Sequence, residues 1–279
     1  MTIPGSGWRA GVYAQDEWAI AETLNATAGL RMDAKDGSHR VFSPRVGLIW
    51  SAGPATAWKA LYGRAHRAPN VFERELDYVS QAPNLSLKGE KVDTLELVAD
   101  HRVGSDLALR ASAYAWNMQD LVTLGTDPVS DRPQYQNGAA IEARGVELSA
   151  AKTWVRDGSA RGSVSYQRPR YADGSALANS PQWLGKLDYA RPLGASGAHL
   201  GYQLQYASKR LAIDGTGLRG YWLSSVNVVA DRWIENVELS LGVHNLFAAS
   251  YQHPGSRNNW QNALQQDGRS VRAKLGYRF

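Results

Sequence analysis

Hydrophobic and polar residues alternate one by one along most of the chain. In the segment 271–279, Val, Ala, Leu, Tyr and Phe alternate with Arg, Lys, Gly and Arg. The same period of two recurs at 24–33, 107–113, 200–206 and 237–244. A period of two places successive side chains on opposite faces of a β-strand, whereas an amphipathic helix repeats every 3.6 residues. No helical stripe competes with this alternation, so the pattern predicts an all-β fold.

The connections between the alternating segments are short and long in turn. Short polar turns fall at 51–56, 102–106 and 231–236. Longer stretches fall at 67–90, 117–140, 171–180, 208–220 and 248–268. Antiparallel hairpins with tight turns at one end and extended loops at the other are typical of transmembrane β-barrels of the outer membrane.

The segments predict about 13 strands of roughly ten residues, a length that crosses a bilayer at a tilt. Their centres lie near Tyr13, Ala28, Gly47, Tyr62, Glu96, Ala111, Glu147, Val164, Lys186, Leu204, Val226, Leu241 and Lys274. If the last strand ends at the short-turn side, the first strand also runs toward that side. Closing such a set would place two parallel strands together, so we expect part of a larger antiparallel barrel with open edges.

The aromatic residues favour a membrane barrel over a soluble sandwich or propeller, which would also show alternation. The chain has 10 Trp and 13 Tyr against 4 Phe, so most aromatic rings carry a polar group suited to a lipid–water boundary. Nine of the Trp residues lie near segment ends: Trp8, Trp18, Trp50, Trp58, Trp116, Trp154, Trp183, Trp222 and Trp233. We expect Val271, Ala273, Leu275, Tyr277 and Phe279 to face lipid. No apolar run is long enough for a membrane helix, and residues 1–7 lack the pattern of a secretory signal.

The charge and the reactive residues limit the chemistry. Lys plus Arg minus Asp plus Glu is 31 − 26 = +5, and the pI is near 9.4, which favours an anionic partner such as lipopolysaccharide or an acidic ligand. The basic residues are scattered singly, so nucleic acid is not expected. There is no cysteine, and the six His residues show no metal-ligand spacing. No catalytic constellation is evident, and we expect neither an enzyme nor a cofactor or metal site.

Several short motifs follow one another in a characteristic order. They are Gln-Asp-Glu-Trp at 15–18 with Gly-Leu-Arg-Met-Asp at 29–33, Gly-Arg-Ala-His-Arg-Ala-Pro-Asn at 63–70, Asn-Leu-Ser-Leu-Lys-Gly-Glu-Lys at 84–91 with Thr-Leu-Glu-Leu at 94–97, Arg-Gly-Val-Glu-Leu at 144–148, Asn-Leu-Phe at 245–247 with Tyr251, and Gly-Tyr-Arg-Phe at 276–279. Their order and spacing resemble the C-terminal barrel of TonB-dependent outer-membrane receptors, which import ferric siderophores, cobalamin, haem and some glycans. Two departures are Ala248, where the family commonly has Asp, and His66, where it commonly has Phe.

The resemblance implies a bacterial outer-membrane location and a place within a barrel of 22 strands around a plug. Residues 1–279 would form a partial barrel domain that lacks the plug and the TonB-contacting segment, as a fragment, a partial gene or an assembly subunit. Contact with the TonB complex would then pass only through the missing plug, and we expect no energised uptake by this chain alone. The resemblance also implies outer-membrane lipid and lipopolysaccharide as surroundings, and Phe279 as the signal read by the barrel assembly machinery.

In such receptors, ligand contacts lie in the long loops and the upper lumen, where Arg binds anionic chelates and aromatic rings cover organic scaffolds. The candidates are Arg67, Arg74, Tyr78, Tyr135, Arg168, Arg170, Tyr171, Arg210, Arg257 and Trp260. Haem is disfavoured because no His lies between the Arg-Ala-Pro and Asn-Leu boxes. Lumen-facing charges that could form cross-strand ion pairs are Glu96, Glu147, Lys186, Asp188, Glu238, Arg272 and Lys274.

The leading hypothesis is the barrel portion of an active importer of a ferric siderophore or a similar metal chelate. Two alternatives stay open on the sequence alone. One is a passive pore or structural barrel of the outer membrane, and the other is a soluble β-rich binding module.

Overall fold

The computed structural model describes residues 8–35, 40–155, 158–256 and 260–279. Its internal contacts divide the chain into two units. The first unit holds the described residues up to Val98 together with Tyr114–Arg144 and Arg170–Ser175, and the second holds Ala99–Ala113, Gly145–Pro169 and Ala176–Phe279. Strands β5 (Glu90–Val103), β6 (Leu107–Gln119) and β9 (Ile141–Trp154) contribute residues to both units.

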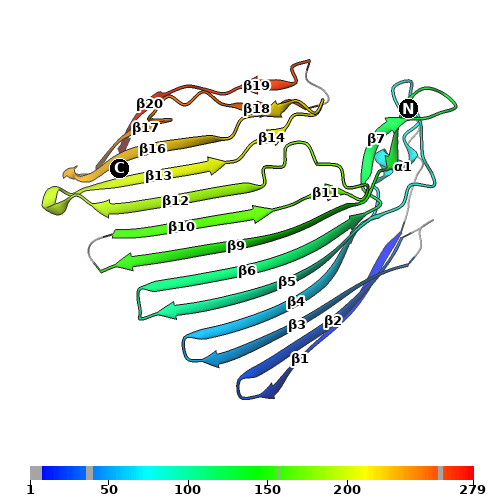
Figure 1. Cartoon of the computed structure of the whole chain (residues 1–279), viewed down its shortest axis with the longest axis horizontal. Helices are drawn as coiled ribbons and strands as arrows, with labels where there is room; N and C mark the ends of the chain where they lie inside the picture. The colour runs from blue at the N-terminus through cyan, green and yellow to red at the C-terminus, as the bar shows by residue number, and fades with distance from the viewer. Residues whose placement is uncertain (1–7, 36–39, 156–157, 257–259) are drawn as a thin grey trace. The chain divides into compact units, whose positions relative to one another are not determined.

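The first unit begins with four long antiparallel strands, of which the first and second, and the third and fourth, are joined by tight turns (Figure 1). They are β1 (Arg9–Ala21), β2 (Leu24–Lys35), β3 (Val41–Gly53) and β4 (Thr56–Arg67). Trp18 lies opposite Ala26, and Trp50 lies opposite Trp58. Every residue of β1 is exposed, and within this unit β1 pairs only with β2. An edge strand with free backbone groups on one side is the open edge that the strand count predicts.

The loops of the first unit carry structure of their own. They contain the helix α1 (Val71–Glu75), the hairpin of β7 (Val122–Thr126) and β8 (Pro133–Asn137), and the short strand β11 (Arg170–Tyr171), which pairs with the start of β9. The Asn70 side chain begins α1 in a capping box with Glu73.

The second unit continues the antiparallel arrangement from the later part of β9. Its long strands are β10 (Gly158–Gln167), β12 (Trp183–Pro192), β13 (Ala198–Ala207), β16 (Tyr221–Ile234), β17 (Val237–His244) and β20 (Ser270–Tyr277). Each is hydrogen-bonded to the next in antiparallel register. Shorter elements lie in the connections: η1 (Gly194–Ser196), the hairpin of β14 (Arg210–Leu211) with β15 (Gly217–Leu218), and the hairpin of β18 (Gln252–Pro254) with β19 (Ala263–Gln265).

These strands confirm the predicted architecture. Each of the predicted strand centres, from Tyr13 to Lys274, lies within a long strand, and the connections alternate between tight turns and long loops. The result follows from the period of two, which is a local property of the backbone and does not depend on what the strand packs against.

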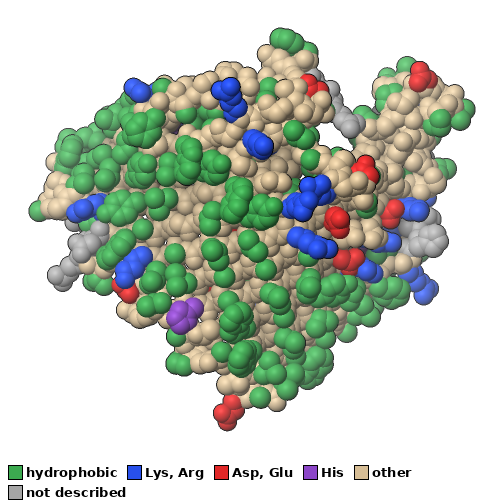
Figure 2. Space-filling model, in the orientation of Figure 1, with side chains coloured by type: hydrophobic (Ala, Val, Ile, Leu, Met, Phe, Trp, Pro, Cys, Tyr) green, Lys and Arg blue, Asp and Glu red, His purple; other side chains and the backbone are tan. Residues whose placement is uncertain are grey.

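One face of the second unit is apolar and open. The exposed fractions of Val271, Leu275 and Leu241 are 64%, 72% and 55%, and no large side chain of the described residues is fully buried. Hydrophobic side chains spread over the face turned to the viewer in Figure 2, with few charges between them. A water-soluble sheet would cover such a face with a second layer, whereas a barrel wall leaves it to lipid. The exposed row on β20 agrees with the predicted lipid-facing residues.

Aromatic pairs mark both margins of this apolar face. Tyr166 packs on Trp183 with ring centroids 4.8 Å apart near the long loops, and Trp154 packs on Tyr189 at 6.4 Å near the short turns. Val146 lies opposite Tyr166, and the eight residues from Val146 to Trp154 rise by ~26 Å along the strand, or ~20 Å across a bilayer at a tilt of about 40°. This spacing suits aromatic girdles that flank the hydrocarbon layer. Among the described residues, no helix has the length and hydropathy of a membrane span.

Candidate functional site

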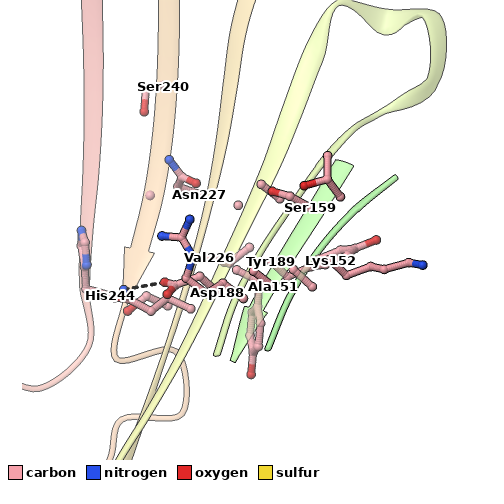
Figure 3. A pocket seen from close by; sticks show the side chains of 18 of the residues that line it. Ala151, Lys152, Ser159, Asp188, Tyr189, Val226, Asn227, Ser240 and His244 are labelled. Atoms are coloured by element: carbon pink, nitrogen blue, oxygen red, sulfur yellow. Dashed lines mark hydrogen bonds between the residues drawn. The ribbon is translucent and has the colours of Figure 1, made fainter. Parts of the chain in front are cut away.

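The face of the second unit opposite the apolar one is polar, and we call it the polar wall. It is built by register: Arg161 of β10 lies opposite Asp188 of β12, which lies opposite Gln203 of β13. The Gln203 side chain donates a hydrogen bond of 2.9 Å to Asp188 (Figure 3). Asn227 and Gly242 continue the same face on β16 and β17. The side chains of the polar wall border a hollow of about 670 Å³.

The charges of the polar wall are only partly paired. Lys274 forms an ion pair of 3.1 Å with Glu238, which confirms one of the cross-strand pairs expected from the sequence. Arg110 forms an ion pair of 2.6 Å with Asp100, and neither residue was among the charges expected from the sequence. Arg272 has no ion-pair partner among the described residues. Exposed pairs of this kind stabilise a fold by only about 0–1 kcal/mol each, so they contribute little to the stability of the wall.

In the first unit, the Arg-Ala-Pro and Asn-Leu motifs meet through one guanidinium. Arg67, at the end of β4, binds Glu73 of α1 at 2.9 Å and Glu90 of β5 at 2.6 Å. Glu90 also accepts a hydrogen bond of 2.9 Å from the backbone N–H of Val122. These contacts tie β4, α1, β5 and the β7–β8 hairpin together and give Arg67 a bracing role within the fold. Its role in ligand binding stays a prediction.

Two asparagines extend this bracing. The Asn84 side chain donates to the Tyr135 carbonyl at 2.8 Å. The Asn137 side chain accepts from the Lys88 N–H at 2.9 Å and donates to the Lys88 carbonyl at 3.0 Å. Phe72 of α1 meets the Tyr135 ring edge-on at 6.3 Å. The loop after β4 is therefore anchored on the β7–β8 hairpin, a connection that the sequence analysis did not identify.

The structure sorts the sequence candidates into groups. Arg67, Arg74, Tyr78 and Tyr135 belong to the braced loops of the first unit, where the Arg74 guanidinium donates to the Leu85 carbonyl at 3.3 Å. Arg170 and Tyr171 form β11, with Arg170 held by the Gly174 carbonyl at 2.6 Å. The second unit contains Arg168, Arg210 and Trp260, the last of which is almost fully exposed. Arg257 lies outside the described residues.

A cluster of four side chains, which we call the Arg210 cluster, lies at the long-loop end of the polar wall. It comprises Arg210 of β14, Tyr221 at the start of β16, Tyr251, and His253 of β18. Tyr221 shares the alternation of Ser225 and Asn227 on β16, so it belongs to the polar face. The Tyr221 and Tyr251 rings lie 4.6 Å apart, and the Tyr221 hydroxyl lies 3.3 Å from Nε2 of His253.

Arg210 joins the two loop hairpins at this point. Its Nη2 donates to the Gln252 carbonyl at 3.1 Å, and its guanidinium carbon lies 5.5 Å from the centroid of the Tyr221 ring. Its Nε is shielded from solvent and has no hydrogen-bond partner among the described residues. A buried donor without an acceptor is costly in a folded protein, and the other contacts of Arg210 hold the guanidinium at this point.

The protonation states of the cluster follow from its burial. Burial, and then the positive charge of Arg210, lower the pKa of His253, so its imidazole is neutral near pH 7. Burial, and then the neighbouring Tyr221 and Asp267, raise the pKa of Tyr251. The arrangement thus combines one cation, two phenols and one neutral imidazole.

Sequence reasoning found Arg210 but missed its three aromatic partners. In the sequence, Tyr251 stands out only as part of a motif, and His253 is one of six His residues that show no metal-ligand spacing. A usable signal was present at Tyr221, because it begins a strand on the polar face directly after a long loop.

An all-β wall with one lipid-compatible face and one polar face defines an integral outer-membrane β-barrel protein, and this sets aside the soluble binding module. Residues 3–246 match the model of the family described as TonB dependent receptor-like, beta-barrel. The chain therefore belongs to the TonB-dependent receptor family, whose members are outer-membrane receptors and not enzymes.

Similar proteins agree with this assignment. The iron-regulated outer membrane virulence protein of Vibrio cholerae is 34% identical over 152 residues, which cover 51% of this chain and 23% of that protein. Among solved structures, the siderophore receptor PirA of Acinetobacter baumannii has a TM-score of 0.80 at 15% identity, covering 98% of this chain and 46% of that one. The FrpB iron transporter of Neisseria meningitidis has a TM-score of 0.76 at 21% identity, covering 97% and 45%. The structural likeness shows the fold, and the chain spans less than half of these proteins.

Proposed function

We propose that the chain forms barrel wall and ligand-contacting loops of an outer-membrane receptor that imports a ferric siderophore or a similar anionic metal chelate. Import of this kind would be energised through TonB acting on a plug domain. The names of the similar proteins, an iron-regulated outer-membrane protein, a siderophore receptor and an iron transporter, support iron as the cargo.

The observation that carries this proposal is the Arg210 cluster. The Arg210 cation lies beside two phenol rings in tilted contact, at the end of the polar wall where the long loops lie. A guanidinium recognises anionic oxygens, and aromatic rings cover flat ligand groups with little loss of conformational freedom. Ferric chelates commonly present both kinds of surface.

In this proposal, the other candidate residues differ in how directly they contact the ligand. Trp260 is free to cover a ligand from the loops, and Arg257 lies close to it in the sequence. Arg67 and Arg74 contribute indirectly, because their guanidinium groups are held within the braced loops. Lipopolysaccharide around the aromatic girdles, and the assembly machinery at Phe279, complete the proposed partners. The Phe279 ring is fully exposed beside Tyr277.

The test is uptake of radioactive iron chelates by a receptor that contains this chain together with a plug domain, in cells that lack their own ferric-chelate receptors. We expect saturable uptake that disappears when TonB is deleted. Arg210→Gln should raise the Kd about tenfold or more, since a charged hydrogen bond of about 1.5–3 kcal/mol is lost. Arg67→Gln is the comparison variant. If Arg67 only braces the loops, this substitution should lower the surface abundance of the protein; if Arg67 contacts the ligand, it should lower binding alone. TonB-independent, non-saturable flux would favour the passive pore instead.

A further inference from the structure

We propose that the Arg210 cluster selects ferric chelates that leave two adjacent coordination positions of the iron open, and that His253 and Tyr221 fill those positions. The inference rests on the proposed function and deepens it, because it names the class of chelate. The preferred ligand is then a tetradentate ferric complex, in which water completes the six ligands. In a hexadentate complex of the same binding groups, the chelator fills all six coordination positions of the iron and leaves none for the protein.

The first argument is the separation of the two donor atoms. The Tyr221 hydroxyl oxygen and Nε2 of His253 lie 3.3 Å apart. Two neighbouring ligands of an octahedral ion, at bond lengths of about 2.1 Å, lie about 3.0 Å apart. The two atoms are hydrogen-bonded to each other, so coordination has to replace this bond, and a shift of about 0.3 Å then gives them the spacing of two ligands of one ion.

The second argument is the chemistry of the donors. Imidazole nitrogen is a common ligand for iron, and a phenolate oxygen is a hard anionic donor that suits the small, highly charged ferric ion. Among the described residues, no three His, Asp or Glu side chains are grouped for metal binding. Two protein ligands hold free iron weakly, but they suffice when a chelator supplies the other four.

The third argument is the charge that surrounds the pair. The Arg210 cation over the Tyr221 ring stabilises the negative charge that this phenol acquires on coordination. The Tyr251 ring lies 4.6 Å from the Tyr221 ring at an interplanar angle of 42° and meets His253 edge-on at 5.6 Å, so both rings are held in place before the ligand arrives.

The exchange balances without any change of oxidation state. Two water molecules leave the ferric ion, the Tyr221 hydroxyl loses its proton to solvent, and its oxygen and the His253 nitrogen form the two new bonds. The iron stays ferric throughout, and no electron is transferred. One proton is released for each chelate bound, and the entering phenolate lowers the net charge of the iron centre by one.

The experiment compares two probes that share the same binding groups, the ferric complex of a linear bis-catecholate and that of a tris-catecholate. Binding to the purified full chain is measured by quenching of tryptophan fluorescence, and coordination by the ligand-to-metal charge-transfer band of the complex. We expect the bis-catecholate complex to bind at least tenfold more tightly, and its band to shift on binding. The tris-catecholate band should stay unchanged.

Two variants test the named residues. Tyr221→Phe retains the aromatic ring but not the donor oxygen, and His253→Ala removes the nitrogen. Each should weaken the bis-catecholate complex at least tenfold, abolish or alter the band shift, and leave the tris-catecholate affinity within twofold. The matched controls Tyr189→Phe and His199→Ala lie at the short-turn end of the same unit and should change neither probe.

The outcomes separate this inference from the proposed function. Equal binding of both complexes with no band shift, or a bis-catecholate affinity unaffected by Tyr221→Phe, overturns the inference and leaves the proposed function in place. Binding of neither complex, together with no iron uptake in cells, overturns the proposed function and the inference with it.

Discussion

A charge placed at the middle of the apolar face should unfold the wall, whereas the same charge on the next residue should not. Leu241 of β17 lies on the apolar face, opposite Ala273, and retains 55% of its exposed surface. Its neighbour Ser240 borders the hollow on the polar wall. Leu241→Arg and Ser240→Arg therefore introduce one cation at nearly the same depth, on opposite faces.

The magnitude follows from the depth of the residue. Val237 lies opposite Tyr277 at the short-turn girdle, and Leu241 is four residues further along the strand. Four residues rise by ~13 Å, or ~10 Å across the bilayer at a tilt of about 40°, which is close to the midplane of an apolar band about 25 Å tall. Leu241→Arg should then cost about 2–4 kcal/mol. Leu275→Arg, two residues from Tyr277, should cost less, and Ser240→Arg should cost under about 0.5 kcal/mol.

The measurement is reversible unfolding in urea of the protein inserted into phosphatidylcholine vesicles, followed by tryptophan fluorescence. A loss of 2–4 kcal/mol corresponds to a change of about 30- to 1,000-fold in the folding equilibrium. Replacing Lys274 by Gln on the polar wall serves as a further control with a small expected loss. Equal losses for Ser240→Arg and Leu241→Arg would refute the assignment of the two faces.

The strands were predictable because their signal is local. Alternation at 237–244 or 271–279 fixes both the strand and its two faces, since a shift of one residue would turn every apolar side chain to the wrong side. The short α1 and the β7–β8 hairpin were not predictable in this way. They are stabilised by bonds such as Asn84 to Tyr135 and Asn137 to Lys88, which join residues 51 and 49 positions apart. No periodicity in the sequence encodes such contacts.

The candidate site was predictable only in part, for the same reason. Loop arginines and aromatic residues could be named from chemistry, and Arg210 was among them. Its grouping with Tyr221 and His253 depends on contacts between distant segments: Arg210 meets Gln252 across 42 residues of chain, and Tyr221 meets His253 across 32. In addition, composition cannot distinguish a free arginine from one such as Arg67, whose charge is already bound by two carboxylates.

Three further perturbations test the loops. Ala248 has a left-handed φ of 54°, which costs a residue with a Cβ about 1–2 kcal/mol, so Ala248→Gly should stabilise the protein by about 1 kcal/mol in urea unfolding while Ala249→Gly does not; no gain would show that the turn is unstrained. A double-mutant cycle of Arg67→Ala with Glu90→Ala should give a coupling energy of up to about 1 kcal/mol, because the Arg67 side chain is 45% exposed, and additive losses would contradict the bracing role. The stability of the wild type should depend on acidity through His253, whose pKa is lowered by burial and by the nearby arginine. Above pH 6.5 the imidazole is neutral in both folded and unfolded chains, so this residue adds no pH dependence there. As the pH falls below 6.5, the unfolded chain takes up the proton first, so stability declines until the pH passes the lowered pKa of the folded state, and then levels off. His253→Gln should flatten this decline in urea unfolding measured from pH 8 to 5, and a wild type that gains stability over that window relative to the variant would show that the folded state favours the charged imidazole instead.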